Sequence, residues 1–181
     1  ISSDEFLPGL RTLAARIKQH GARAAIQLQH AGKVAVCDIA AGRPMLVPSI
    51  PHNSRDEMSA ALTPEEMAAF VKSYTKQGAR VEYKVADRDD IRELTERFAA
   101  AAERARRAGF DGVELHAGHG YILSEFLSPH VNHREDEYGG SLENRVRFLR
   151  ELIEDTKDAV GDRCAIAVRL AVDQLLGPLG I

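Results

Sequence analysis

Two histidines and a tyrosine stand close together in the segment His-Ala-Gly-His-Gly-Tyr, as His116, His119 and Tyr121. Two neighbouring imidazoles can both donate hydrogen bonds to one carbonyl, nitro or phenolate oxygen. A tyrosine hydroxyl, whose ordinary pKa is about 10, can donate a proton beside them. The small residues between the rings let a flat ligand come close to the backbone. These residue types predict a catalytic cluster that holds an electron-withdrawing oxygen and protonates the same molecule.

Zinc binding is one alternative for these histidines, because His130 and His133 form a second H-x-x-H downstream. Zinc sites use three or four His, Cys or carboxylate ligands, and Arg134 places a cation beside His133, which opposes a dication. We therefore predict no metal ligand in this segment. The other alternative is that the histidines are loop residues satisfied by local hydrogen bonds, and the nearby tyrosine makes this the less favoured interpretation.

Three further polar residues stand at the ends of predicted strands. Gln27 and Gln29 share one face of the strand expected at residues 23–28. A carboxamide offers a donor and an acceptor together, which matches the edge of a pyrimidine-like ring, and hydrogen bonds to neighbouring strands are the alternative. Arg169 shares its strand face with alanines that leave room in front of it. Its cation could stabilise a developing anion, or it could form an ion pair with a nearby carboxylate.

The apolar pattern predicts helices and strands in alternation. Apolar positions recur at helical spacing between capping residues and glycine stops, whereas the strand segments are short and apolar. Residues 32–62 contain three prolines and are expected to be loop, and residues 80–85 are expected to be a strand or an extended loop. Thr63, Asp87 and Ser141 are the expected caps. The expected helices are 8–20, 64–73, 88–108 and 142–160, and the other expected strands are 23–28, 111–115 and 163–170.

This alternation is typical of βα units around a parallel sheet. A doubly wound sheet would be favoured by G-x-G-x-x-G directly after a strand, and that motif is absent. The polar residues instead cluster at the C-terminal ends of strands, where barrel enzymes have their active sites. The predicted fold class is therefore α/β, a partial TIM-type (β/α) barrel, because a full barrel takes about 250 residues.

Composition and charge exclude several classes of partner. The 181 residues carry 24 Lys and Arg against 27 Asp and Glu, so a net charge of −3 gives no reason to expect nucleic acid or an anionic membrane. No apolar run approaches the roughly 20 residues of a membrane span, and no signal peptide opens the sequence. Two separate cysteines, Cys37 in an expected loop and Cys164 in an expected core strand, predict a reducing, cytoplasmic compartment.

Longer motifs connect these residues to a known family. The sequence contains H-x-x-H-G-Y from His116, then N-x-R-x-D-x-Y-G-G-S and E-N-R, all between Gly109 and Phe148. It also contains Ile-Gln-Leu-Gln-His-Ala-Gly at 26–32 and Ala-Val-Arg-Leu at 167–170. Together these segments closely resemble the old yellow enzyme family of FMN-dependent oxidoreductases. The nearest likeness is to its bacterial branch, with 2,4-dienoyl-CoA reductase and trimethylamine dehydrogenase.

The resemblance implies a cofactor and the residues that contact it. Gln27 matches the glutamine that hydrogen-bonds the flavin pyrimidine, and Arg169 matches the arginine that stabilises anionic reduced flavin near N1. FMN is the implied cofactor, and NAD(P)H is the implied reductant. Whole relatives in this branch also carry an iron–sulfur site, so a 4Fe-4S cluster is conceivable in a longer parent but is not expected to be bound by this segment.

The resemblance also implies roles on the substrate side. His116 and His119 match the pair that grips the activating oxygen of an alkene substrate, and Tyr121 matches the tyrosine that protonates the carbon opposite the hydride. Gln29 falls at a position that faces the substrate pocket. In the amine dehydrogenases the first histidine is replaced by tyrosine. His116 therefore favours reduction of enones or enoyl compounds over dehydrogenation or demethylation of an N-methyl amine.

The remaining motif is interpreted as structural, a loop braced by ion pairs and a glycine turn; its residues are Asn132, Arg134, Asp136, Gly139 and Gly140. The sequence starts at Ile1 without methionine, and we expect residues 1–181 to be a piece of one FMN-binding barrel domain, roughly its third to fifth strands. The strands expected to hold the FMN phosphate are absent. The alternative to an enzyme with a small-molecule substrate is a non-catalytic half-barrel that self-associates into a homo-oligomer through open strand edges.

Overall fold

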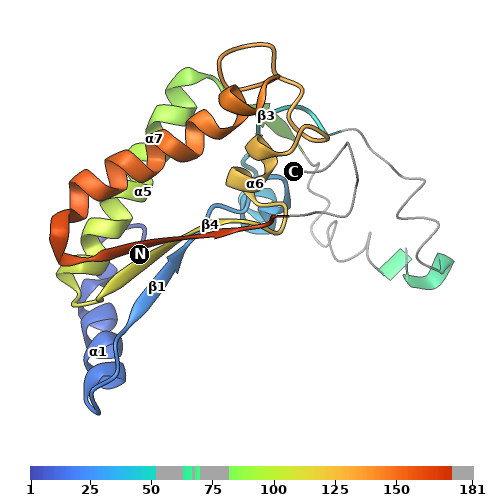
Figure 1. Cartoon of the computed structure of the whole chain (residues 1–181). Coiled ribbons are helices and arrows are strands. Elements are labelled where there is room, and N and C mark those ends of the chain that lie inside the picture. The colour runs from blue at the N-terminus through green and yellow to red at the C-terminus, as the bar shows by residue number, and fades with distance from the viewer. Residues whose placement is uncertain (52–62, 67, 70–81, 173–181) are drawn as a thin grey trace.

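The computed structural model describes residues 1–51, 63–66, 68–69 and 82–172, and its centre is a three-stranded parallel sheet (Figure 1). The strands are β1 (Ala25–Leu28), β4 (Gly112–Ala117) and β5 (Ala165–Leu170), and their spatial order is β1-β4-β5. Parallel neighbours need crossover connections, and helices supply them. The predicted alternation of strands and helices is thus confirmed.

Two long helices, α5 (Arg88–Arg107) and α7 (Leu142–Val160), pack against each other and against the sheet. Figure 1 shows both helices on the same side of the strands. A third helix, α1 (Leu7–Lys18), packs against α5. The short elements that complete the described chain are η1 (Asp4–Phe6), η2 (Gly32–Val34), α2 (Val36–Ala40), β2 (Met45–Val47), β3 (Tyr83–Val85), α6 (Ile122–Leu127) and η3 (Gly161–Arg163).

The predicted helix starts are confirmed by side chains that satisfy free backbone amides. The Asp87 carboxylate accepts from the Asp90 amide at 2.9 Å, and the Asp90 carboxylate accepts from the Asp87 amide at 3.0 Å, which forms a reciprocal capping box. Ser141 Oγ accepts from the Asn144 amide at 3.2 Å, as expected of an N-cap. Thr63 and Glu66 form the same reciprocal box, and most of the helix predicted after them lies outside the described residues.

The stretch predicted as loop contains regular structure, and this corrects the prediction for residues 32–62. Cys37 lies in the short helix α2 and not in a loop. β2 pairs in parallel with β3, in the register Met45 to Tyr83, so residues 83–85 are a strand and not an extended loop. A three-residue strand has no readable period, and its pairing partner lies beyond a long intervening segment. The sequence pattern therefore could not reveal it.

The hydrophobic core lies between the sheet and the pair α5 and α7. Val113, Leu115 and Ala117 of the central strand β4 are at most 1% exposed, because strands cover both edges of β4 and helices cover this face. Cys164 is also buried, as predicted for a small core residue. β5 differs, since every residue of it except Ile166 is exposed. The core is thus concentrated behind β4.

The N-terminal end of the sheet is held by one carboxylate. Asp111 accepts hydrogen bonds from Lys18 Nζ at 2.9 Å, Arg23 Nη1 at 3.0 Å and the Ala24 amide at 2.9 Å. The hydrogen bond from the Ala24 amide is the largest single cause that lowers the pKa of Asp111 to about 2, followed by the bond from Lys18. This carboxylate ties the end of α1 and the start of β1 to the start of β4.

The motif predicted to be structural forms a brace, which we define as Asn132, Arg134 and Asp136. The Arg134 guanidinium donates to both Asp136 oxygens, at 2.5 and 2.9 Å. It also donates to the carbonyl oxygens of Ala86, at 2.5 Å, and of Pro48, at 3.3 Å. Those two carbonyls directly follow β3 and β2. The brace therefore holds the two-stranded sheet against the chain that leads into α7.

Glycine is required beside the brace. Asn132 Nδ2 donates to the carbonyl oxygens of Phe126 and Tyr138, each at 2.7 Å, and this folds the chain tightly back on itself. A Cβ atom at Gly139 would overlap the carbonyl oxygen of Arg134. Backbone cannot move aside as a flexible side chain can, so the glycine allows the turn to close.

We expect Gly139→Ala to lower the free energy of unfolding by about 1–3 kcal/mol, because the added methyl group must displace packed backbone. The matched control is Gly9→Ala in α1, where a Cβ meets nothing within 4 Å. That control should raise stability by about 0.5–1 kcal/mol, as alanine does in an exposed helix. Urea unfolding of both variants measures the difference. Equal effects of the two substitutions would contradict the role given to Gly139.

Candidate active site

His116 stands at the carboxyl end of the central strand. β4 runs on through Ala117, so the strand is two residues longer than predicted and His116 lies within it, paired with Arg169 of β5. Its side chain is only 3% exposed. Because paired residues of parallel strands point to the same face, His116 and Arg169 share the face opposite the hydrophobic core. The predicted parity of these strands is confirmed.

The two histidines meet, as the spacing predicts, although no helical turn brings them together. The rings of His116 and His119 have centroids 4.9 Å apart and planes at 76°. After Ala117 the backbone leaves the strand, and His119 adopts a left-handed conformation with φ of 58°, followed by Gly120 with φ of 71°. Left-handed φ is uncommon for a residue with a side chain, and such strain collects at functional sites. His119 is exposed and His116 is buried beneath it.

Tyr121 completes the cluster. Its ring centroid lies 5.2 Å from that of His116, with the planes at 63°. Tyr121 is the N-cap of α6, and its amide donates to the Gly118 carbonyl at 3.3 Å. The sequence prediction did not include α6. The signal was present, since the apolar residues of Ile-Leu-Ser-Glu-Phe-Leu recur four apart, but one and a half turns give too short a window to separate a helix from a buried strand.

A second row of side chains crosses the sheet two residues before His116 along β4. Gln27 pairs with Glu114 in register, and Glu114 pairs with Ala167. Gln27 Nε2 donates to Glu114 Oε1 at 2.5 Å. The interpretation of Gln27 as a hydrogen-bond donor to a neighbouring strand is thus correct for its amide nitrogen. Glu114 was not among the predicted site residues, although it shares the strand face of His116 and could have been included on that basis.

Arg169 and Gln29 flank this face. Arg169 is exposed, and within the described part of the chain it forms no ion pair with a carboxylate, so that alternative for Arg169 is not what the structure shows. Gln29 follows β1 and is exposed. With Gln27 it lines a groove of about 760 Å³ between β1 and α5. The structure therefore brings together the two histidines, Tyr121 and Arg169, while Gln29 lies at the β1 edge and does not line the histidine cluster.

The environment favours the uncharged form of His116. Burial lowers the pKa of His116 below its ordinary value, and the neighbouring His119 and Arg169 lower it further, while Glu114 opposes them. Its Nδ1 is buried without a hydrogen-bond partner in the described residues. Buried polar atoms in native structures are nearly always paired, so an orphan at the bottom of a histidine cluster marks a place where a ligand or solvent group belongs.

Two further observations concern metal ions and membranes. Among the residues that the structure describes, no three His, Cys, Asp or Glu side chains gather closely enough to hold a metal ion. No helix in the described ranges is both long enough and apolar enough to cross a bilayer.

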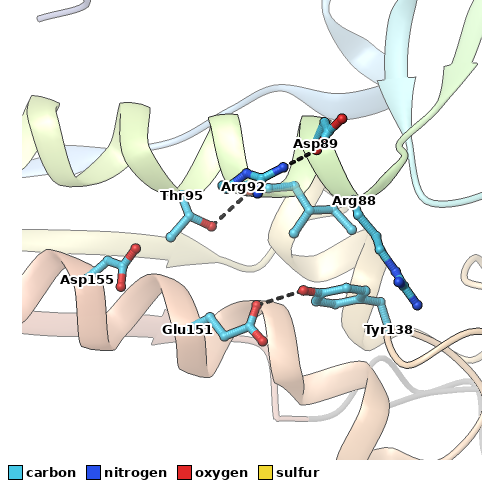
Figure 2. Close-up of a pocket in the computed structure, with 8 residues that line it drawn as sticks. Arg88, Asp89, Arg92, Thr95, Tyr138, Glu151 and Asp155 are labelled. Atoms are coloured by element: carbon cyan, nitrogen blue, oxygen red, sulfur yellow. Dashed lines mark hydrogen bonds and ion pairs between the residues drawn. The ribbon is translucent and has the colours of Figure 1, made fainter.

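The hollow between α5 and α7 is a different feature (Figure 2). It measures about 420 Å³, and none of its lining residues belongs to the histidine cluster. Figure 2 shows Tyr138 reaching toward Glu151, and the hydroxyl donates to Glu151 Oε2 at 3.0 Å. Burial and this bond raise the pKa of Tyr138 to about 12. Charged side chains of both signs line the hollow, namely Arg88, Arg92, Asp89, Glu151 and Asp155.

Comparison with known proteins gives consistent matches. A family model described as NADH:flavin oxidoreductase / NADH oxidase matches residues 1–180. The chain is 41% identical over 157 residues to an NADPH dehydrogenase of Bacillus subtilis, which covers 87% of this chain and 38% of that relative. The chain thus spans about two fifths of that curated relative's length.

Solved structures agree with the sequence matches. Histamine dehydrogenase from Rhizobium sp. 4-9 superposes with a TM-score of 0.77 and 38% identity, over 98% of this chain and 23% of that one. Old Yellow Enzyme from Pichia sp. AKU4542 superposes with a TM-score of 0.75 and 30% identity, over 93% of this chain and 40% of that one. Both superpositions are strong enough to show the fold of this chain.

We expect His116 to titrate below its ordinary pKa in a histidine-resolved NMR titration, and so to be neutral at pH 7. His119→Ala and Arg169→Met should each raise that pKa, since each removes positive charge, whereas Glu114→Gln should lower it. Because the folded pKa lies below the unfolded one, His116 costs stability as the pH falls below about 6.5. His20→Ala, at an exposed site, is the control and should leave the titration of His116 unchanged.

Proposed function

Because this chain belongs to the NADH:flavin oxidoreductase / NADH oxidase family, we propose that it forms the substrate-holding part of an FMN-dependent enzyme that reduces activated C=C bonds at the expense of NAD(P)H. Membership and the superpositions confirm the predicted family and the predicted partial TIM-type barrel. The observation that supports the activity best is the buried His116, whose Nδ1 has no partner among the described residues and whose ring lies 4.9 Å from that of the exposed His119.

The described residues fit the ring portion of FMN. Gln27 and Arg169 stand on the open face of the sheet, in the two rows that also carry Glu114 and His116. The amide nitrogen of Gln27 donates a hydrogen bond to Glu114, and this bond orients the carboxamide. Arg169 is exposed and, among the described residues, has no carboxylate partner, so its cation is available to negative charge. We propose that Gln27 binds the pyrimidine edge of the flavin and that Arg169 stabilises its anionic reduced form.

The histidines would bind and polarise the substrate. His116 and His119 each donate an N–H to the oxygen of an enone, and withdrawal of electron density through that oxygen makes the distant alkene carbon electrophilic. Reduced FMN, when bound, supplies the hydride that this carbon accepts. The Tyr121 hydroxyl donates a proton to the other alkene carbon, which completes the addition of two hydrogens across the double bond. Arg169 would compensate the negative charge that the reduced ring carries before it gives up the hydride.

Amine oxidation is a second candidate, because histamine dehydrogenase is among the superposed structures. The site argues against it, since a pair of N–H donors suits an oxygen acceptor better than a substrate that is itself an ammonium donor.

A non-catalytic, self-associating half-barrel is the third candidate, and the exposed residues Val168 and Leu170 on the edge strand β5 favour it. We propose that residues 1–181 form part of a single FMN barrel domain. We also propose that the parent enzyme binds a small-molecule substrate and that copies of the chain associate into a homo-oligomer.

We expect the purified chain to quench the fluorescence of added FMN. Gln27→Leu should weaken FMN binding by about threefold to tenfold, the effect of one neutral hydrogen bond. Arg163→Gln, exposed at the opposite end of β5, is the control and should change little. A colourless oligomer that leaves FMN fluorescence unchanged would exclude the enzyme interpretation for this chain and support the half-barrel.

We expect His116→Ala combined with His119→Ala to weaken phenol binding to the FMN-loaded chain by about tenfold to a hundredfold, since two hydrogen bonds to a charged oxygen are lost. His20→Ala serves as the control. Phenol is followed through the visible absorbance of the flavin. Tyr121→Phe should leave phenol affinity intact and slow reduction of an enone. Turnover of trimethylamine without turnover of an enone would favour the amine candidate.

A further inference from the structure

A buried carboxyl group lies just behind the candidate site. Glu125 belongs to α6, the six-residue helix that begins directly after Tyr121. Its side chain is 1% exposed, and every other residue of α6 is buried as well. A carboxyl group is costly to bury without partners, so its environment should explain why it is there.

One side of this carboxyl group contacts the turn after β1. Glu125 Oε1 accepts a hydrogen bond from the Lys33 amide at 2.9 Å. Gly32 lies flat against the same group, because a Cβ at Gly32 would stand 2.5 Å from Oε1 and 2.8 Å from both Cδ and Oε2. Gly32 also has φ of 55°, a conformation that suits glycine. The turn and the carboxyl group are therefore fitted to each other.

This contact joins the two halves of the candidate site. The turn at 30–33 continues from β1, which carries Gln27 and ends next to Gln29. The Ile122 amide donates to the His30 carbonyl at 3.1 Å, and the Glu125 amide donates to the Tyr121 carbonyl at 2.8 Å. One backbone bond and one side-chain bond thus bridge the end of β1 to the first turn of α6, where Tyr121 is the N-cap.

Burial shifts the ionisation of this carboxyl group up to neutral pH. Burial raises the pKa of Glu125 to about 7, against the opposing effects of the Lys33 amide and the Lys33 charge. The elements packed against α6 are η2, β2, β4 and α7. Lys33 of η2 is the charged residue that acts on Glu125. Of the other packed elements, β4 carries Glu114 and His116, α7 carries Arg145, which donates to the Leu127 carbonyl oxygen at 2.8 Å, and β2 carries no ionisable residue. Oε2 has no partner in the described residues.

We propose that Glu125 is a positioning residue of the active site: its carboxyl group, seated on Gly32 and bonded to the Lys33 amide, fixes the turn after β1 against the start of α6 and so sets Tyr121 relative to the β1 side chains. Glu125 does not touch the substrate. The consequence for catalysis rests on the proposed function, because misplacing a proton donor by an ångström can cost about a hundredfold in rate. The effect of Glu125 on the turn after β1 does not depend on the proposed function.

The test compares Glu125→Gln, which keeps the acceptor oxygen without the titration, with Glu125→Leu, which removes both. Amide hydrogen exchange is measured at Lys33 and Ile122, with Leu115 of β4 as internal reference. We expect Glu125→Leu to lose at least tenfold protection at Lys33 and Ile122 but not at Leu115. Glu125→Gln should stay within about threefold of the unmodified chain. Glu154→Gln, at an exposed site on α7, is the matched control.

The pH profile separates positioning from simple packing. Protection at Lys33 and Ile122 in the unmodified chain should fall as the pH rises from about 4.5 to about 7 and then level off, because between these values the carboxyl group gains by opening to water and ionising. The Glu125→Gln profile should be flat. If Glu125→Leu does not fold, Gly32→Ala supplies the second variant and should open the same amides. Identical profiles for the unmodified chain and Glu125→Gln, or loss of protection at Lys33 in Glu125→Gln, would overturn the proposal.

Exchange needs no flavin, so it distinguishes this proposal from the proposed function. If the exchange results hold and enone turnover is absent in every variant, the positioning role of Glu125 stands and the ene-reductase assignment fails. If turnover is present, Glu125→Leu should lower it at least tenfold and leave phenol affinity nearly unchanged, since the histidine pair belongs to β4 and the turn that follows it. Turnover equal to that of the unmodified chain would overturn the proposal.

Discussion

The parallel pairing of β4 with a strand on each side is the constraint on which the rest of the structure depends. Side chains of a strand alternate between two faces, so burying Val113, Leu115 and Ala117 against the helices forces Glu114 and His116 to the other face. The register with β1 and β5 then places the site side chains in two rows. The same hydrophobic burial that stabilises the sheet therefore arranges the polar groups.

The histidine cluster gains its character from unequal burial. His116 lies inside the strand with its Nδ1 covered, and His119 stands outside on a left-handed turn. The buried imidazole and the exposed one can therefore present hydrogen-bond donors to a ligand at two different depths. The cost of leaving a buried nitrogen unpaired is about 1–3 kcal/mol. At His116 this cost falls beside a backbone residue in a left-handed conformation, and strained residues of this kind collect at ligand-binding places.

Two carboxyl groups show how strongly tertiary contacts set chemistry. Asp111, at the start of β4, accepts from a backbone amide and two cations, and its pKa falls to about 2. Glu125, behind the other end of β4, accepts from one amide in an apolar pocket, and its pKa rises to about 7. The first stabilises the fold above its pKa and loses this as the pH falls. The second costs stability as it ionises, and this cost grows as the pH rises from about 4.5 to about 7. Together with the Arg134 brace, they fix both ends of the sheet.

Local signals in the sequence determined much of this protein. Caps such as Asp87 and Ser141, glycine stops and the period-two pattern specified the long helices and the three strands, because they act over a few residues. The H-x-x-H-G-Y spacing and its family resemblance identified the cluster. Tertiary structure decided the rest: the length of β4 through His116, the short elements α2, β2 and α6, and the bond from Gln27 to Glu114. It also decided the burial of Glu125, whose partner Lys33 is 92 residues away. Burial and pairing over such separations depend on the whole packed chain, and no local pattern encodes them.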